Sequence, residues 1–285
     1  MNLTGTNCII TGGSQGLGRH LVEAFLAAGA HVTFCARTAA DVDQTRCELT
    51  PRLGSGQLLQ GVVCDVSDAA AVRELFVTAA RIGPIRVVVN NAGILGPIGP
   101  TEEISPEEWS RTLQVNLTGT LLVCQEAIRH MRPQRNGRIL NLSGGGATSP
   151  MPRFAAYAAS KAAVVRLTET IAEECRDLGI TANAIAPGAL RTRFTQQVID
   201  AGPERAGGAY HAKNKQWQEE GAADPKLAAA LCVHLAGPGG DGITGKLLSA
   251  QWDSWKDLSE HRTELQGDIF TLRRIVPADR GQKWT

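Results

Sequence analysis

Short, continuously apolar runs alternate along the chain with longer runs of helical periodicity. The apolar runs are NCIIT, HVTFCA, LLQGVVCDV, IRVVVNNAG, GRILNLS, ITANAIAPG and KLLSA. Unbroken apolar character is typical of parallel strands that are buried on both faces. The helical runs lie near 17–28, 40–49, 69–80, 106–131 and 154–178. Repeated strand–helix–strand units predict an α/β fold: one Rossmann-like, doubly wound parallel sheet of about seven strands with helices on both faces.

Two segments depart from this alternation. Residues 193–220 are polar and rich in Gly, Gln, Lys and Arg, which predicts an irregular substrate-loop insertion. After the last strand, residues 251–285 form a C-terminal extension to the catalytic domain of 1–250. The extension is too apolar for a free disordered segment, so we expect it to pack on the core or on a neighbouring subunit and to bear on the substrate pocket. Its apolar residues are Trp252, Trp255, Leu265, Ile269, Phe270, Leu272 and Ile275, and Arg273 and Arg274 are candidates for an anionic group or an interfacial carboxylate.

Composition and charge exclude several classes of protein. The formal net charge of +1 and the 5% aromatic content give no indication of nucleic acid or of an anionic membrane as a partner. No run reaches the ~18 apolar residues of a membrane span, and no cleavable leader is expected. Seven scattered cysteines without a C-x-x-C motif predict a reducing, cytoplasmic location. The six histidines show no metal-ligand spacing, so we predict no metal.

Tyr157 and Lys161 form the first candidate for chemistry. Four residues apart on a helix, their side chains lie on one face and can meet at one small molecule. A nearby ammonium favours the phenolate and would lower the pKa of the tyrosine from ~10 towards the range of an acid/base catalyst. The spacing alone is common, and a half-buried tyrosine beside a solvated lysine is the alternative.

A glycine-rich turn follows the first strand, with the sequence TGGSQGLG at 11–18. Such a turn brings backbone close to a pyrophosphate, and the following helix supplies amide donors at its N-terminus. The spacing G-x-x-x-G-x-G differs from the commoner dinucleotide fingerprint, and a purely geometric turn is the alternative.

Taken in order along the chain, these motifs resemble the short-chain dehydrogenase/reductase family in its single-domain branch. The resemblance covers about 4–250 and rests on Gly12, Gly16 and Gly18, Asn90-Asn91-Ala92-Gly93, Asn116, Tyr157 with Lys161, and Pro187-Gly188. It implies an NAD(P)-dependent oxidoreductase that interconverts a carbonyl and a secondary alcohol by hydride transfer. It also implies a homodimer or homotetramer joined by the helices near 106–131 and 154–178.

The resemblance assigns roles residue by residue. For catalysis, Tyr157 exchanges the proton on the substrate oxygen, Lys161 lowers the tyrosine pKa and positions the nicotinamide ribose, and Asn116 holds a water that links Lys161 to solvent. For the cofactor, the pyrophosphate and adenosine contacts fall on Gly12, Ser14, Gln15, Gly16, Leu17, Gly18, Asp65, Val66, Asn91, Ala92 and Gly93, and the nicotinamide contacts on Pro187, Gly188, Leu190 and Thr192. Asp65 as a helix cap, and Asn90 or Asn91 as partners of turn amides, are the alternatives.

The end of the second strand indicates which cofactor is preferred. An acidic residue at that place would bind the ribose 2′-hydroxyl. This chain has Ala36 followed by Arg37 and Thr38, and a guanidinium can bind a 2′-phosphate. NADP(H) is therefore predicted over NAD(H). The alternative is a solvated Arg37, and Gln15 stands where many NADP-preferring relatives carry a second basic residue.

The catalytic serine is less well defined. Counted back from Tyr157, the family serine falls at Gly144, one residue after Ser143. Either Ser143 takes this role on a shifted backbone, which three consecutive glycines permit, or the site lacks the hydroxyl. Ser143 is our prediction, with backbone amides or a water as the alternative way to polarise a substrate oxygen.

The substrate is not defined by these motifs. Arg153, Arg191 and Arg193 near the expected pocket mouth favour an anionic or polyhydroxylated ligand, although surface solvation explains them nearly as well. Two other functions stay open: a sugar or cyclitol epimerase or dehydratase that uses bound NAD(P) transiently, and a non-catalytic dinucleotide sensor.

Overall fold

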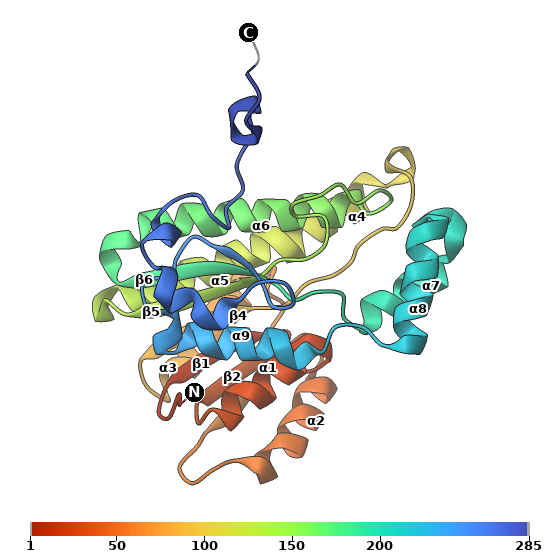
Figure 1. Ribbon diagram of the computed structural model, residues 1–285. Coiled ribbons are helices and arrows are strands. Elements are labelled where there is room, and N and C mark those ends of the chain that lie inside the picture. The colour runs from red at the N-terminus through yellow and green to blue at the C-terminus, as the bar shows by residue number, and fades with distance from the viewer. Residues whose placement is uncertain (1, 284–285) are drawn as a thin grey trace.

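The computed structural model describes residues 2–283 and contains one seven-stranded parallel sheet in the order β3-β2-β1-β4-β5-β6-β7 (Figure 1). The predicted sheet is confirmed, and each predicted apolar run contains one strand. The strands are β1 (Asn7–Thr11), β2 (His31–Ala36), β3 (Leu59–Val63), β4 (Ile85–Asn90), β5 (Gly137–Leu142), β6 (Ile180–Ala186) and β7 (Leu247–Ser249).

Helices cover both faces of the sheet, as a doubly wound fold requires. One apolar core joins the sheet to α1, α2 and α9, and a second joins the opposite face to α3, α5 and α6. No helix among residues 2–283 is long and apolar enough to cross a membrane. The helices are α1 (Gly16–Ala27), α2 (Ala39–Leu49), α3 (Ala69–Ala80), α4 (Pro106–Leu113), α5 (Gly119–Met131), α6 (Ala155–Glu174), α7 (Arg193–Ala206), α8 (Gly208–Glu220) and α9 (Pro225–Ala236).

The strand order reverses between β1 and β4, which lie side by side although they are far apart in sequence. Because all strands are parallel, the loops that follow β1, β4, β5 and β6 meet at one edge of the sheet. Ligands of doubly wound folds bind in the crevice at this reversal. The fold therefore brings the glycine-rich turn, Asn91–Gly93, the glycines after β5 and Pro187–Gly188 to a common edge.

Residues 193–220 are the main error of the sequence-based prediction. They form the helices α7 and α8, which pack on each other and project from one end of the molecule (Figure 1). Their Gln, Lys, Arg and Glu residues are good helix formers, but the polar surface of α8 hides any apolar stripe. Glycines with positive φ mark the joints: Gly202 kinks α7, and Gly207 and Gly221 bound α8.

Helix α9 was also missed, although its start carries a recognisable signal. Asp224 caps it by accepting a hydrogen bond from Lys226 N at 2.9 Å, and Pro225 occupies the first helical position. The predicted helix of 106–131 is present as α4 and α5, joined by one π-helical turn over Gln114–Thr118.

The first part of the tail completes the core of its own chain. Trp255, Leu258 and Leu265 are buried in the cluster that includes α1 and α9. The indole of Trp255 packs edge-on against His234 of α9, with ring centroids 5.4 Å apart, and donates to the Ala250 carbonyl at 3.1 Å. Residues 255–265 thus belong to the folded domain.

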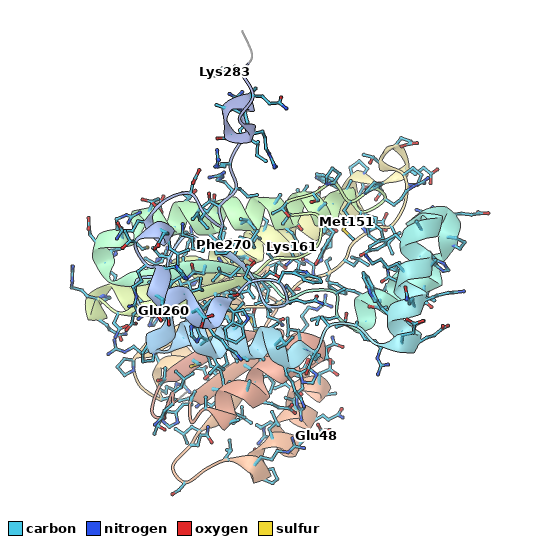
Figure 2. The ribbon with its side chains drawn as sticks, in the orientation of Figure 1. Glu48, Met151, Lys161, Glu260, Phe270 and Lys283 are labelled. Atoms are coloured by element: carbon cyan, nitrogen blue, oxygen red, sulfur yellow. The ribbon has the colours of Figure 1, made fainter. Side chains whose placement is uncertain are left out.

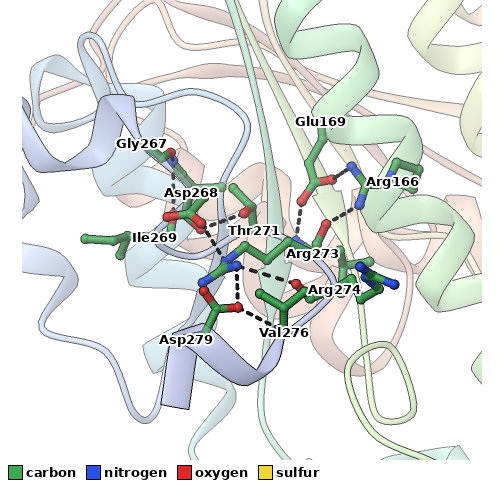
Figure 3. A network of polar contacts seen from close by, with 12 residues as sticks. Arg166, Glu169, Gly267, Asp268, Ile269, Thr271, Arg273, Arg274, Val276 and Asp279 are labelled. Carbon is green, nitrogen blue, oxygen red and sulfur yellow. Dashed lines mark hydrogen bonds and ion pairs between the residues drawn. The ribbon is translucent and has the colours of Figure 1, made fainter. Parts of the chain in front are cut away.

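The next part of the tail is anchored by polar contacts to β7 and α6 (Figure 3). Leu247 N donates to the Phe270 carbonyl at 2.8 Å, and Glu169 accepts from Leu272 N at 2.6 Å. Arg273 pairs with Asp268 at 2.5 Å and Asp279 at 3.0 Å, so its guanidinium is already occupied by carboxylates of the tail itself. The anionic group expected at this arginine is thus supplied by the same chain.

Beyond Arg273 the chain leaves the core and stands above α6, with Lys283 at its outer end (Figures 1 and 2). Ile275 is 58% exposed, and at the start of the tail Trp252 is 79% exposed. These two apolar side chains, which were expected to pack, are left largely exposed by the described residues, 2–283.

Candidate active site

Helix α6 carries Tyr157 and Lys161 into the edge of the sheet. Both side chains are buried, with exposures of 8% and 5%. Lys161 Nζ donates to the Leu142 carbonyl at the end of β5 at 2.8 Å and lies 5.8 Å from the centre of the Tyr157 ring. The spacing therefore brings the two groups together on one face of the helix, at the place where the glycine-rich loops meet.

The electrostatics of this pair differ from the expectation. Burial raises the pKa of the Tyr157 phenol, with a further contribution from Tyr210, and burial lowers the pKa of Lys161 to about 8. The predicted lowering of the tyrosine pKa by lysine is therefore wrong for the protein without cofactor. Both groups lose water on burial, and the loss of hydration disfavours the charged form of each.

The residue that faces the Tyr157 hydroxyl is Gly144. A Cβ added to Gly144 would lie 2.3 Å from the phenol oxygen. Ser143 is buried with an exposure of 3%, and its hydroxyl has no hydrogen-bond partner among residues 2–283. The structure thus brings Gly144 against Tyr157, and the Ser143 hydroxyl makes no hydrogen bond with the phenol.

Asn116 lies in the π-helical turn and is fully buried. Its amide nitrogen donates to the Ile94 carbonyl at 2.9 Å and to Ser160 Oγ at 3.0 Å, while its amide oxygen accepts from Ile94 N at 2.8 Å. A Cβ on Gly93 would lie 3.2 Å from this oxygen and 3.7 Å from Lys161 Nζ. Asn116 therefore ties the loop after β4 to α6 near the lysine. Its role in holding a water stays a prediction.

The glycine-rich turn is packed backbone against backbone. A Cβ on Gly18 would lie 1.9 Å from the Gly12 carbonyl oxygen, so α1 approaches the turn as closely as glycine allows. Asn91 Nδ2 donates to the carbonyls of Thr11 and Gly12 at 3.0 and 3.1 Å, and Thr11 Oγ1 accepts from Asn91 N and Ala92 N. Asn91 and Ala92 hold this turn in shape, and the Asn91 side chain satisfies carbonyls of the turn, and not its amides as the alternative held.

The start of α1 is suited to an anion. Gln15 occupies the cap position without a side-chain hydrogen bond, Gly16 has φ +52°, and Leu17 is buried beneath them. The first N–H groups of the helix are thus not capped by a side chain, and the helix dipole favours negative charge there. The pyrophosphate of a dinucleotide fits this donor set. The contacts predicted for Ser14 and its neighbours stay predictions.

Asp65 follows β3 and has two partners. Its carboxylate accepts from Ser67 N at 2.9 Å and from Arg111 at 2.9 Å. Burial opposes ionisation of Asp65, but the hydrogen bonds from Ser67 and Arg111 outweigh it and lower the pKa of the carboxyl. The helix cap that was the alternative for Asp65 is made by Asp68 instead, which accepts from Ala70 N at 2.8 Å. An ionised, oriented acceptor thus lies where the adenine edge is predicted, with Val66 buried beside it.

The loop after β6 reaches both α1 and the tail. Thr192 caps α7 by accepting from Phe194 N at 3.2 Å, and its methyl carbon would lie 3.7 Å from a Cβ on Gly16. Gly188 has φ +87°, and a Cβ there would lie 3.0 Å from the Gln251 amide oxygen. Pro187–Thr192 therefore faces the glycine-rich turn. The nicotinamide contacts of Pro187, Gly188, Leu190 and Thr192 stay predictions.

Apolar side chains that the sequence did not indicate surround Tyr157 on the other side. Phe194 of α7 lies edge-on to the Tyr157 ring, with centroids 6.0 Å apart at 89°. Tyr210 of α8 lies edge-on to Phe154, with centroids 5.1 Å apart. The same apolar cluster includes Leu95, Ile98, Met151, Val198 and Ala206. In the sequence, the one indication that these residues lie near the site was their position, either after a strand or within 193–220, the segment predicted to be irregular.

Comparison with known proteins agrees with this fold. A family model described as short chain dehydrogenase matches residues 6–202. A short-chain type dehydrogenase/reductase of Picea abies is 34% identical over 254 residues, covering 86% of this chain and 91% of that protein. The 3beta-hydroxysteroid dehydrogenase 1 of Eggerthella lenta is 40% identical over 205 residues, covering 71% of this chain and 77% of that protein.

Among solved structures, a variant of actinorhodin polyketide ketoreductase with NADPH superposes with a TM-score of 0.77 at 28% identity, covering 87% of this chain and 97% of that one. The chain belongs to the short-chain dehydrogenase/reductase family. It is an NAD(P)-dependent oxidoreductase of that family.

Proposed function

We propose that the protein is an NADP(H)-dependent oxidoreductase that interconverts a carbonyl and a secondary alcohol, with Tyr157 as the acid/base group. The carrying observation is the burial of Tyr157 and Lys161 side by side on α6, at the edge where the glycine-rich turn and the Pro187–Thr192 loop meet. The cofactor supplies the hydride chemistry. The chain holds the cofactor, orients the carbonyl and exchanges a proton at the phenol oxygen.

Substitution of Tyr157 by Phe tests the acid/base role. It removes the hydroxyl and keeps the ring that packs on Phe194, so the affinity for NADPH should stay within about three-fold. Turnover should fall by about 10³-fold or more, because general acid catalysis and the hydrogen bond to the substrate oxygen are both lost. Fluorescence titration of NADPH measures the affinity, and NADPH oxidation with a panel of ketones measures the turnover. Turnover within a few-fold of wild type would exclude this mechanism.

The preference for NADP(H) rests on the end of β2. Ala36 is buried, while Arg37 is exposed and makes no hydrogen bond or ion pair with any residue in the described part of the chain. Thr38 occupies the N-cap position of α2, but its side chain makes no capping hydrogen bond. The first amides of α2 are therefore uncapped by a side chain, and they lie next to Arg37. A free guanidinium beside an uncapped helix start supports binding of a 2′-phosphate. No carboxylate stands at positions 36–38 to repel it.

Arg37→Ala tests this preference against a matched control. We expect NADPH to bind about 10–100-fold more weakly and NADH to bind equally well, because only NADPH carries the charge-assisted contact. Arg46 lies on α2 but pairs with Asp43 at 3.4 Å, so Arg46→Ala should leave both affinities unchanged. Equal weakening of both cofactors by Arg37→Ala would assign Arg37 to the solvated surface and remove the basis for the preference.

We also propose a homodimer or homotetramer in a reducing, cytoplasmic compartment. The segment above α6, with exposed Ile275, supports a contact with a second copy. All seven cysteines are free thiols, and six of them are buried, which supports a reducing location. Light scattering after size-exclusion chromatography would test the assembly, and a monomeric mass at micromolar concentration would exclude it.

A further inference from the structure

Three consecutive glycines follow β5, and only the first has its side-chain space occupied by Tyr157. A Cβ on Gly144 would lie 2.3 Å from the phenol oxygen and 3.1 Å from Cζ. Gly144 does not have a positive φ, so its backbone conformation does not itself require glycine. A Cβ on Gly145 would meet nothing closer than Met151 Sδ at 3.5 Å. The contact with Tyr157 is therefore what requires glycine at 144.

The Ser143 hydroxyl makes no hydrogen bond with Tyr157. Successive residues at the end of an extended strand face opposite sides, so Ser143 and Gly144 do not face Tyr157 together. The Ser143 hydroxyl is enclosed without a hydrogen-bond partner among the described residues, 2–283. Its backbone N–H continues the sheet by donating to the Ile185 carbonyl at 2.8 Å. Ser143 thus belongs to the end of the strand.

Resting on the proposed function, we propose that Tyr157 works without a serine hydroxyl beside it and that Gly144 is the residue that positions it. The phenol oxygen occupies the volume that a side chain at position 144 would need. Any such side chain displaces the hydroxyl from Lys161 and from the substrate oxygen. In this proposal Ser143 has no part in binding the substrate oxygen, in place of the catalytic role predicted from the sequence.

Four single variants test this proposal: Ser143→Ala, Gly144→Ala, Gly144→Ser and the control Gly145→Ala. We expect Gly144→Ala and Gly144→Ser to lower kcat by about 100-fold, as a misplaced catalytic group does, with NADPH affinity within about three-fold of wild type. Ser143→Ala and Gly145→Ala should retain kcat within about three-fold. If Ser143 held the substrate oxygen, its loss would cost about 10²–10³ in kcat.

A second readout does not depend on turnover. The chain has two tyrosines, Tyr157 and Tyr210, so in a Tyr210→Phe background the tyrosinate absorbance reports on Tyr157 alone. Gly144→Ala should move the apparent pKa of this phenol, whereas Gly145→Ala should not. The proposal is overturned if Ser143→Ala loses about 100-fold in kcat with cofactor binding intact, or if Gly144→Ser is as active as wild type. Failure of the proposed function would look different, because the wild-type protein would then oxidise no NADPH with any carbonyl.

A different observation concerns the substrate. The side of Tyr157 opposite the cofactor loops is lined by apolar groups: Phe194 against its ring, and Leu95, Val198 and Ala206 buried in the same cluster. Of the three arginines expected to mark an anionic ligand, Arg153 flanks this cluster, with its Cγ 3.9 Å from a Cβ placed on Gly207, and the other two lie outside it. Arg191 donates to the Gln218 carbonyl at 3.3 Å, and Arg193 is exposed.

From this lining we infer that the substrate is an apolar ketone or the corresponding alcohol, held against Phe194. Apart from the hydroxyls of Tyr157 and Tyr210 and the sulfur of Met151, the side chains of this cluster are hydrocarbon, which gives no partner to the hydroxyls of a polyol. The carbonyl oxygen is the one polar atom of an apolar ketone, and Tyr157 satisfies it. This inference also rests on the proposed function, but not on the position of Gly144.

A comparison of 2-decalone with xylulose, both with NADPH, tests the substrate class. We expect kcat/KM to favour 2-decalone by at least about 100-fold, and Phe194→Ala to lower it for 2-decalone by about 10–100-fold while cofactor affinity is unchanged. Phe270, which lies on the tail, provides the control Phe270→Ala, for which no such loss is expected. A preference for xylulose, or no effect of Phe194→Ala on 2-decalone, would overturn the inference. Inactivity with every carbonyl would instead count against the proposed function.

Discussion

The two sides of Tyr157 are built in opposite ways. On the cofactor side, the contacts are between backbone atoms: Gly18 approaches the Gly12 carbonyl, and Asn91 and Thr11 hold the turn through hydrogen bonds. On the substrate side, apolar side chains of α7 and α8 make the contacts, and glycines with open surroundings, such as Gly202 and Gly221, join the helices.

This difference shows which parts of the enzyme can change. Backbone packing around a pyrophosphate leaves no room for a methyl group, so the same residues recur wherever the turn is used. An apolar wall of separate side chains can be altered one residue at a time, at a cost that depends on the volume removed. We therefore expect binding of the cofactor to depend on backbone geometry, and choice of substrate to depend on side-chain shape.

The largest effect is expected from Gly18→Ala on the cofactor side. The new methyl group would lie 1.9 Å from the Gly12 carbonyl oxygen, and neither backbone can move without opening the turn. We expect NADPH affinity to fall by at least about 100-fold and the free energy of unfolding by about 1–3 kcal/mol. NADPH titration and urea unfolding measure the two. Gly54→Ala is the matched control, because its methyl group would meet only the Gln57 side chain at 3.5 Å. A Gly18→Ala protein that binds NADPH normally would contradict the close-packed picture.

Truncation after Asp253 should have the next largest effect. It removes Trp255, Leu258 and Leu265 from the core that includes α1 and α9, and buried side chains of this size contribute about 1.5–3 kcal/mol each. We expect the free energy of unfolding to fall by about 4 kcal/mol or more in urea, followed by circular dichroism. Truncation after Arg273 removes none of these three residues, so its unfolding midpoint should match that of the full chain. Equal stability of both truncated proteins would show that 255–265 does not belong to the folded domain.

Sequence patterns predicted the parts of this molecule that depend on periodicity and backbone geometry. The seven strands follow from unbroken apolar runs, and the glycine-rich turn and the Tyr157–Lys161 pair follow from spacing on one turn or one helix face. Helices α7 and α8 could not be predicted in this way, because their polar surfaces mask the period and Gly202 interrupts it. The direction of the Tyr157 pKa shift could not be predicted from the sequence either, since it depends on how completely the folded chain excludes water from the phenol.

The next effect concerns Lys161, at the border between the two sides. Its pKa is lowered to about 8 in the folded protein from 10.5, so between these values the unfolded chain holds a proton that the folded protein lacks. The free energy of unfolding should therefore rise with pH in this window, by about 2 kcal/mol between about pH 8 and about pH 9.5. Above about pH 10 the raised pKa of Tyr157 acts in the opposite direction, because only the unfolded chain then loses that proton. Lys161→Met should remove the rise in this window. An identical pH profile for both proteins would show that Lys161 is hydrated.

The smallest effect is expected from Arg191→Ala, at the outer rim of the substrate side. The Arg191 side chain is exposed, and its one hydrogen bond, to the Gln218 carbonyl, is long at 3.3 Å. Loss of such a contact should change the free energy of unfolding by no more than about 0.5 kcal/mol. If the apolar wall selects the substrate, KM for 2-decalone should also stay within about two-fold, because a neutral ketone has no group for a guanidinium to bind. A 2-oxo acid provides the opposing case. If the enzyme prefers the 2-oxo acid to 2-decalone, and if Arg191→Ala removes this preference, then Arg191 and not Phe194 determines the choice of substrate.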